Sequence, residues 1–110
     1  MIQGEVWNAN LNPTVGSEQG GFRPVVIVSG NAMNENLNVV LVCPITSKIK
    51  NYLGNVILQP DALNGLKKVS EILNIHVRYL PKDRLKKKVG SINEVQLSET
   101  KKGLNDLLTY

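Results

Sequence analysis

The residues best suited to chemistry lie in a polar, glycine-rich stretch, residues 16–24, directly before the apolar run 25–28. In it, Glu18 precedes a glycine pair and Arg23, whose guanidinium presents five donors in a rigid fork that fits phosphate or carboxylate. Pro24 has no N–H and suits the start of a strand, so the sequence predicts that Arg23 lies at the rim of a buried sheet. A purely structural loop, in which Arg23 pairs with Glu18, is the alternative interpretation.

Two further polar groups accompany predicted strands. Thr46 and Ser47 follow an apolar run, and His76 and Arg78 stand two residues apart in the alternating segment 70–79. Residues two apart in a strand project from the same face, so we expect His76 and Arg78 to share one. Arginines, hydroxyls and a histidine, without paired carboxylates or metal ligands, favour binding and cleavage of a phosphodiester over hydrolysis of a sugar or peptide.

Composition limits the class of protein. With 110 residues, 42% of them hydrophobic, the chain predicts a single domain over residues 1–110 that folds alone or as a homo-oligomer. The net charge of +4 is compatible with nucleic acid as a partner. One cysteine, Cys43 in an apolar run, and one histidine argue against a structural zinc site, so we expect no metal and no cofactor. No long apolar run or signal peptide is apparent, which predicts a cytoplasmic protein.

Short apolar runs separated by turn residues are typical of a small, mainly β domain. Strands are predicted at residues 4–11, 25–29, 39–45, 55–58, 70–79 and 89–92, with single helical turns at 59–63 and 81–85 and a loop at 30–38. The runs 25–29 and 39–45 are apolar at successive positions, which indicates central strands covered on both faces. In segment 70–79, we expect an inward-facing row made by Leu73, Ile75, Val77 and Tyr79.

One longer helix is predicted at the end of the chain. Asn93 resembles an N-cap residue with Gln96 three positions later, and the helix is expected to reach about residue 108. An apolar stripe facing the sheet is expected from Leu97, Leu104 and Leu108. Gly103 should weaken this helix by about 1 kcal/mol.

Five motifs occur in order along nearly the whole chain. They are Gly4-Glu5-Val6-Trp7; Leu11-Asn12-Pro13; Gly16-Ser17-Glu18-Gln19-Gly20-Gly21 with Arg23-Pro24; Pro44-Ile45-Thr46-Ser47; and Val77-Arg78 with Lys82-Asp83-Arg84-Leu85. Together they resemble the MazF/PemK-type toxins. The resemblance implies a mainly β (α+β) fold, a Src-homology-3-like small barrel of the CcdB/MazF/PemK type with short helices and a C-terminal helix, assembled as a homodimer.

The resemblance also implies a function. It is that of a type II toxin–antitoxin toxin, a metal-independent, sequence-specific endoribonuclease acting on single-stranded RNA such as mRNA. Attack by the ribose 2′-OH would leave a 2′,3′-cyclic phosphate and a 5′-hydroxyl. The implied partners are the RNA substrate and a cognate antitoxin whose partly disordered C-terminal segment covers the RNA groove, with operator DNA contacted only through the antitoxin complex and no membrane involved.

Residue roles follow from the resemblance position by position. Arg23 corresponds to the family's catalytic arginine and Thr46 to its catalytic threonine, while Glu18, Gln19 and Ser47 align with residues that line the substrate groove. Arg78 matches an arginine that has a catalytic role beside an acidic residue, but Tyr79 and Leu80 follow it here. His76 stands where many members carry glutamine. It is expected either to assist catalysis or to line the groove as a hydrogen-bonding residue.

A division of labour is predicted within this site. Arg23 suits stabilisation of the negative charge on the phosphorane. It does not suit the role of general base, because an arginine keeps its proton at cellular pH and cannot accept another. The base stays open between His76 and Glu18. Phe22 is the best placed of three aromatic candidates for stacking on a base, the others being Trp7 and Tyr52, and flanking phosphates are assigned to Lys48 and Lys50.

Two other functions share this fold. One is a binding protein that poisons a protein target, as the related CcdB toxins do, and the other is an RNA-binding member that no longer cuts. The Gly-Gly-x-Arg-Pro motif together with the Thr-Ser pair favours the nuclease. Incubation with single-stranded RNA and EDTA separates these possibilities.

Overall fold

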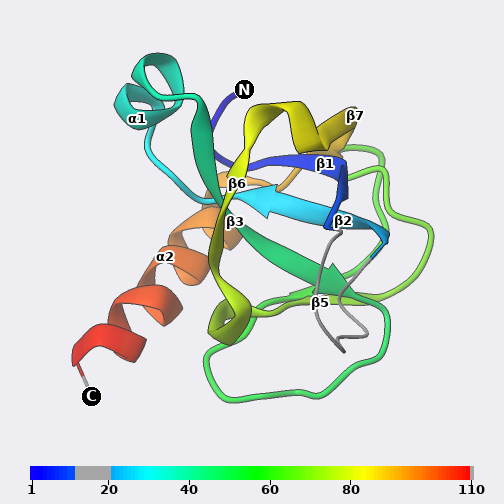
Figure 1. The fold of residues 1–110 in the computed structure, drawn as a ribbon. Helices are drawn as coiled ribbons and strands as arrows, with labels where there is room; N and C mark the ends of the chain where they lie inside the picture. The colour runs from blue at the N-terminus through cyan, green and yellow to red at the C-terminus, as the bar shows by residue number, and fades with distance from the viewer. Residues whose placement is uncertain (12–20, 110) are drawn as a thin grey trace.

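The computed structural model describes residues 1–11 and 21–109, which form one curled sheet of seven strands and a long C-terminal helix (Figure 1). The strands are β1 (Glu5–Asn10), β2 (Phe22–Ile27), β3 (Val39–Thr46), β4 (Ile57–Leu58), β5 (Ser70–Ile72), β6 (Arg78–Pro81) and β7 (Leu85–Ser91). The helices are α1 (Asn31–Asn36) and α2 (Glu94–Thr109), with 3₁₀ turns η1 (Asn74–His76) and η2 (Lys82–Arg84). None of the helices in this part of the chain is long and apolar enough to cross a membrane.

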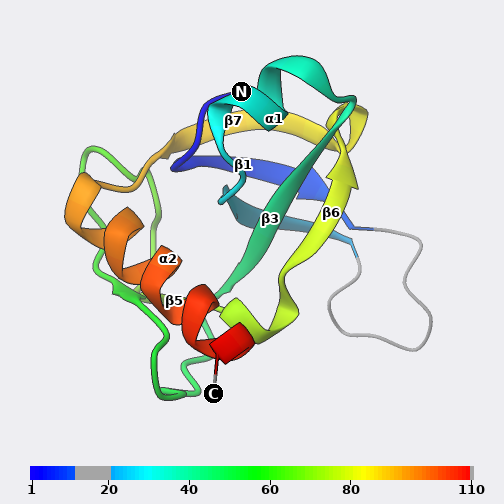
Figure 2. The same cartoon turned by 90° about the vertical axis from the view of Figure 1, so that its left-hand side faces the viewer.

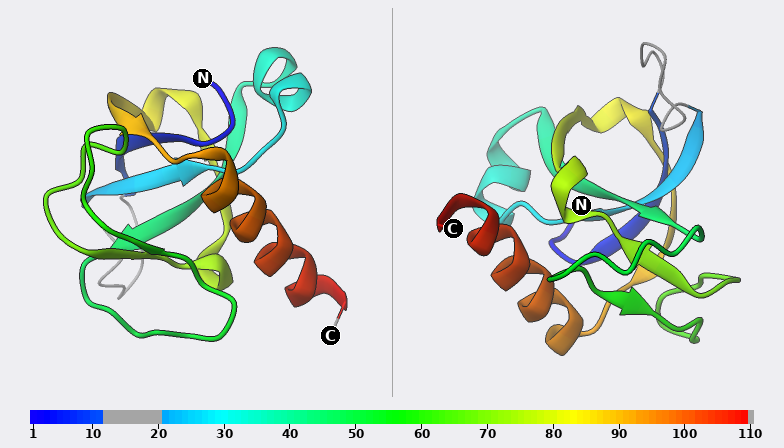
Figure 3. Two further views of the ribbon diagram at one scale, coloured as in Figure 1. Left: turned by 180° about the vertical axis from the view of Figure 1, so that it is seen from behind. Right: turned by 90° about the horizontal axis from the view of Figure 1, so that it is seen from below.

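The strands are antiparallel and follow the order β4-β5-β3-β2-β1-β7. Strand β3 is the pivot, because its end pairs with β5 while its first four residues pair with β6. The sheet therefore bends along β3 and curls toward a barrel, and α2 lies to one side of the strands (Figures 2 and 3).

Alternating residues of the central strands feed two separate cores. In β2, Val26 packs in the first core, whereas Val25 and Ile27 pack in the second. In β3, Ile45 packs in the first core and Val42 in the second. The first, the helix-side core, is covered by residues of α2; the second, the barrel core, lies among β1, β2, β3, β6 and β7. The prediction that both runs are central strands buried on each face is confirmed.

Helix α2 begins as its capping signal predicts. The backbone N–H of Gln96 donates to Asn93 Oδ1 at 2.8 Å, and the Asn93 N–H donates to Gln96 Oε1 at 3.0 Å. Leu97 and Leu104 pack against the helix-side core. The expectation that Leu108 also faces the sheet is wrong, because this residue is 89% exposed where the helix extends beyond the sheet.

Gly103 has a packing role that its helix propensity does not reveal. It is buried in α2, and a Cβ there would lie 2.3 Å from Asn74 Nδ2 and 2.6 Å from the carbonyl oxygen of Gly54. The missing side chain therefore lets α2 approach η1 closely.

Segment 70–79 is not the continuous strand that its alternation predicts. Ile45 pairs with Ile72, and the same register would place Ile75 opposite Val42, but Arg78 is there instead. Turn η1 takes up the three extra residues. The predicted inward row is consequently wrong: Ile75 is 65% exposed, whereas Asn74, assigned to the polar face, is buried.

Smaller differences arise in the connections. The loop expected at 30–38 contains α1, and the helical turn expected at 59–63 is a turn without helix, whereas that at 81–85 is present as η2. The last strand begins at Leu85 rather than near 89, so Lys86, Lys87 and Lys88 lie in a strand paired with β1. Their exposed side chains make this a solvent-facing stretch.

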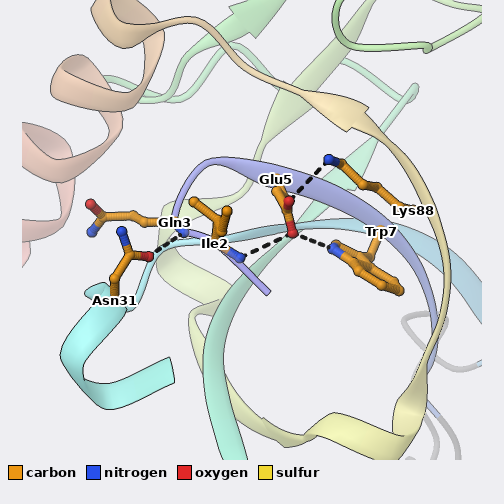
Figure 4. A network of polar contacts seen from close by, with 6 residues as sticks. All are labelled: Ile2, Gln3, Glu5, Trp7, Asn31 and Lys88. Carbon is orange, nitrogen blue, oxygen red and sulfur yellow. Dashed lines mark hydrogen bonds and ion pairs between the residues drawn. The ribbon is translucent and has the colours of Figure 1, made fainter. Parts of the chain in front are cut away.

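A buried carboxylate ties the start of the chain to β1 and β7 (Figure 4). Glu5 Oε1 accepts hydrogen bonds from the Ile2 N–H and from Trp7 Nε1, each at 3.0 Å, and Oε2 lies 3.0 Å from Lys88 Nζ. Burial alone would raise the pKa of Glu5, but the bonds from Ile2, Trp7 and Lys88 lower it. Trp7 is thereby held by the fold and packs against the barrel core.

Candidate active site

Strand register brings the two expected catalytic residues together. Val25 pairs with Pro44, and continuing this antiparallel register by two residues places Arg23 opposite Thr46. In its own strand, each residue lies an even number of positions from the residues that pack in the barrel core, so both side chains belong to the face that points toward that core. Arg23 and Thr46 therefore occupy neighbouring strands on the same side of the sheet.

Two cavities meet at this pair. A large cavity of about 610 Å³ and a small cavity of about 160 Å³ are both lined by Arg23, Thr46 and Lys48. The large cavity is also lined by Phe22, Ser47, Lys67 and Lys68, and the small cavity by Lys50, Tyr52, Leu73 and His76. The pair consequently lies at the junction of two hollows rather than in a closed pocket.

The electrostatic character of both cavities is basic. Within residues 1–11 and 21–109, every Arg, Lys, Asp or Glu that lines either cavity is a lysine or an arginine. Clustered cations in hollows lined by low-dielectric protein concentrate anions, and a chain of phosphates supplies one for each nucleotide. The arrangement suits an extended polyanion better than a neutral ligand.

The Thr46 hydroxyl is held in a defined orientation. It is 7% exposed, and its Oγ1 accepts a hydrogen bond from the backbone N–H of Lys48 at 3.1 Å. Because that bond uses an acceptor lone pair, the hydroxyl proton is available for donation to a ligand oxygen. Thr46 can therefore act as a donor beside the guanidinium of Arg23.

The loop after Thr46 is organised by a buried carboxylate that the sequence analysis missed. Glu71 is 0% exposed and accepts from the backbone N–H groups of Lys50, Asn51 and Tyr52 at 2.6, 2.8 and 3.0 Å, and from Asn55 Nδ2 at 2.8 Å. It pairs with Thr46 across β3 and β5. Its sequence signal was that it is the one acidic residue in the predicted strand 70–79.

These bonds also determine the ionisation of Glu71. Burial alone would raise its pKa, but the hydrogen bonds from Asn55 and from the three backbone N–H groups lower it. Glu71 is therefore an anion whose acceptor capacity is taken up by the loop. It holds the backbone of Lys50 and Tyr52 at the edge of the small cavity.

The structure places the remaining candidates in three groups. Phe22, 62% exposed, and Ser47 line the large cavity, while Lys50 and His76 line the small one. Arg78 lines a separate cavity of about 310 Å³ formed by β6 and η2. Glu18 and Gln19 lie outside the described residues.

The expected pairing of His76 with Arg78 on one strand face is wrong. His76 ends η1, and Arg78 begins β6 after the three-residue shift described above. Among the cavities described for residues 1–11 and 21–109, His76 shares the small cavity with Arg23 and Thr46, whereas Arg78 lines the cavity at β6 and η2. The short-range alternation of the sequence concealed this separation.

Cys43 behaves as a core residue. Its side chain is fully buried in the helix-side core, and burial raises the pKa of the thiol to about 12. The thiolate needed for nucleophilic attack is therefore not accessible near neutral pH, and Cys43 has no part in the site.

Comparisons with known proteins identify the group to which this architecture belongs. The family model described as "PemK-like, MazF-like toxin of type II toxin-antitoxin system" matches residues 2–108. The chain belongs to this family. Endoribonuclease MazF of Staphylococcus saprophyticus subsp. saprophyticus is 35% identical over 106 residues, covering 96% of this chain and 88% of the relative.

Solved structures agree with the family assignment. MazF (Form-I) from Deinococcus radiodurans gives a TM-score of 0.83 at 32% identity and covers 100% of this chain and 97% of that one. MazE-MazF (Form-II) from the same organism gives 0.72 at 29% identity, covering 97% and 92%. The predicted family, the curled, mainly β fold with a C-terminal helix and the endoribonuclease class of toxin are confirmed.

Proposed function

We propose that this toxin cleaves single-stranded RNA at specific sequences without a metal ion. The ribose 2′-OH attacks the adjacent phosphorus, the bond to the 5′-oxygen breaks, and a 2′,3′-cyclic phosphate and a 5′-hydroxyl remain. The observation that carries the proposal is that Arg23 and Thr46 together line two basic cavities.

Arg23 and Thr46 are assigned to the charge that develops on phosphorus. A guanidinium can donate two parallel hydrogen bonds to non-bridging phosphate oxygens, and preorganised donors of this kind lower a barrier by about 3 kcal/mol each. Thr46 donates its hydroxyl proton to the same phosphate, because its oxygen already accepts from the Lys48 N–H. Lys48 and Lys50 hold flanking phosphates, and Phe22 and Ser47 contact the nucleotides in the large cavity.

Two titratable residues are candidates for the general base that removes the 2′-OH proton. His76 lines the small cavity with Arg23 and Thr46, and a neutral imidazole there can accept a proton. Glu18 is the second candidate. Arg78 is left out of the chemistry, because it lines a different cavity.

Single-turnover cleavage across pH decides between these bases. If His76 is the base, His76→Ala removes the acidic limb of the pH–rate profile that its protonation produces. An unchanged limb excludes His76, and loss of the limb in Glu18→Gln instead assigns the base to Glu18. Thr46→Val tests the hydroxyl separately, since it preserves side-chain shape.

The partners are proposed from the family and from the MazE-MazF relative. A cognate antitoxin binds the toxin, the toxin forms a homodimer of the single domain 1–110, and operator DNA is contacted only through the antitoxin complex. The site of action is the cytoplasm, where mRNA is found. A pull-down of the co-expressed antitoxin and the mass of the free toxin in solution test these statements.

The decisive experiment is cleavage of a long single-stranded RNA in EDTA by wild-type protein and Arg23→Ala. Wild-type protein is expected to cut, the new 5′ ends should accept phosphate from polynucleotide kinase without prior phosphatase, and Arg23→Ala should lose at least about a hundredfold in rate. Lys101→Ala, on the exposed face of α2, is the matched control for charge. Intact RNA with wild-type protein, or near-normal cleavage by folded Arg23→Ala, contradicts the proposal.

A further inference from the structure

The large cavity extends beyond Arg23 and Thr46 to two lysines that the mechanism above does not use. Lys67 and Lys68 line it together with Leu66. Both lysines are exposed, and neither forms an ion pair with another residue in the described ranges. From the sequence alone they were indistinguishable from an ordinary solvated loop.

The backbone that carries these lysines is fixed from within by one buried amide. Asn64 is 0% exposed; its Oδ1 accepts from the N–H groups of Asp61 and Leu66 at 3.2 and 2.9 Å, and its Nδ2 donates to the Gln59 carbonyl at 2.8 Å. On the other side of the lysines, Ser70 Oγ donates to the Lys68 carbonyl at 2.8 Å. The two lysines therefore emerge from a segment secured at both ends.

Close packing against β7 fixes the same segment from outside. Gly65 has φ +67°, and a Cβ there would lie 2.3 Å from the Val89 carbonyl oxygen. A Cβ on Gly90 would meet the Leu63 carbonyl oxygen at 2.3 Å, and the Ser91 N–H donates to that oxygen at 2.9 Å. The backbone that carries the lysines is therefore already ordered before binding, which reduces the protein's share of the entropic cost of holding a ligand there.

The two cavities place cations on both sides of the reacting centre. Lys50 lies in the small cavity, Lys67 and Lys68 lie in the large one, and Arg23 and Thr46 are common to both. A strand whose scissile phosphate contacts the common pair can continue into each cavity. Phosphates on both sides then meet lysines.

We propose that Lys67 and Lys68 form a second phosphate-binding subsite, which holds the RNA backbone on the side of the scissile bond opposite to the nucleotides held by Lys50. The inference rests on single-stranded RNA being the substrate. It adds to the substrate groove a pair of residues that act in binding and leave the chemical step unchanged.

The test compares the double variant K67Q/K68Q with wild-type protein. The probe is a short single-stranded RNA centred on a mapped cleavage site, or of mixed sequence if no cleavage is found, with every ribose 2′-O-methylated to prevent cutting. The variant is expected to bind about tenfold more weakly near 0.1 M salt and to lower the salt slope by about 1.4, the value for two contacts to a single strand. The control, K101Q/K102Q on the exposed face of α2, removes the same charge and should change both quantities much less.

Truncated probes then locate the subsite. Removing the nucleotides on one side of the site should abolish the K67Q/K68Q penalty, and removing those on the other side should abolish the penalty of Lys50→Gln. Equal binding by K67Q/K68Q and its control, or loss of both penalties with the same truncation, overturns the inference. Because the probe cannot be cut, a protein that binds it but cleaves no RNA contradicts the proposed function alone.

Discussion

Replacing Glu71 by glutamine tests whether this buried carboxylate holds the loop at the small cavity. The carboxylate accepts four hydrogen bonds, three from backbone N–H groups and one from Asn55. Glutamine keeps one acceptor oxygen but turns an NH₂ group toward donors. At about 1.5–3 kcal/mol for each bond to a charged acceptor, losing two corresponds to about 3–6 kcal/mol.

Hydration of the N–H groups that lose their acceptor reduces this loss of stability. Residues 50–54 are exposed, so the freed N–H groups can bond to water once the loop moves. We therefore expect Glu71→Gln to lower the free energy of unfolding by about 2–3 kcal/mol and the melting temperature by roughly 10 °C. Glu99→Gln, on the exposed face of α2, is the control with the same charge change.

The pH dependence gives the same experiment a second readout. Because the pKa of Glu71 is lowered in the folded state, its stabilisation is present above the ordinary value of 4.5 and is lost as the pH falls through the folded value. Urea unfolding should show a large difference between wild type and Glu71→Gln at neutral pH, and the difference should shrink progressively as the pH falls below 4.5. A neutral-pH loss below about 0.5 kcal/mol, or one independent of pH, refutes the reasoning.

The affinity of Glu71→Gln for RNA distinguishes the role of Glu71 in positioning the loop from the effect of its negative charge. Glu71→Gln makes the protein more positive, so long-range attraction alone predicts tighter binding of RNA. Loss of the fixed positions of Lys50 and Tyr52 predicts weaker binding instead. Binding that tightens in Glu71→Gln, as in Glu99→Gln, shows that the loop does not need its buried anchor.

Four further tests, three substitutions and one thiol reaction, examine the packing of the core and the contacts of Glu5. Gly103→Ala should destabilise the protein by about 1–3 kcal/mol in urea unfolding, despite its better helix propensity, because the new methyl group would press on Asn74; a gain in stability contradicts this contact. Cys43, with a pKa near 12, should react with a thiol reagent at pH 8 only after unfolding, and prompt reaction of the native protein shows an accessible thiol. Glu5→Gln should cost about 1–2 kcal/mol at neutral pH and less near pH 3, since the pKa of Glu5 is lowered, whereas Lys88→Gln, which changes an exposed lysine, should cost under about 1 kcal/mol.

Local signals in the sequence predicted the central strands and the last helix. The run 39–45 is apolar at successive positions because both of its faces are buried, and Asn93 with Gln96 forms the expected reciprocal cap. Arg23 just before one apolar run and Thr46 directly after another could be recognised as polar residues at strand ends, and the family resemblance implied that they act together. These features depend on residues close together in the chain.

Features set by distant pairing could not be predicted in the same way. The break at η1 results from two registers on one edge of β3, and nothing in the alternation of residues 73–79 encodes that offset. Glu71 anchors residues some twenty positions earlier, so its role was invisible without the sheet. Lys67 and Lys68 looked like solvent-facing residues because their cavity is formed by strands far away in the sequence.

The two-sided burial of β2 and β3 restricts how this gene can change in length. Inserting one codon within β2 after Arg23 would move the preceding residues to the opposite face, so that Arg23 would project toward the helix-side core and Pro24 or the inserted residue would take its position at the junction. A substitution leaves the register and therefore the faces of both strands unchanged. We therefore expect insertions and deletions to be tolerated better in the connections next to β2 and β3 than within these two strands.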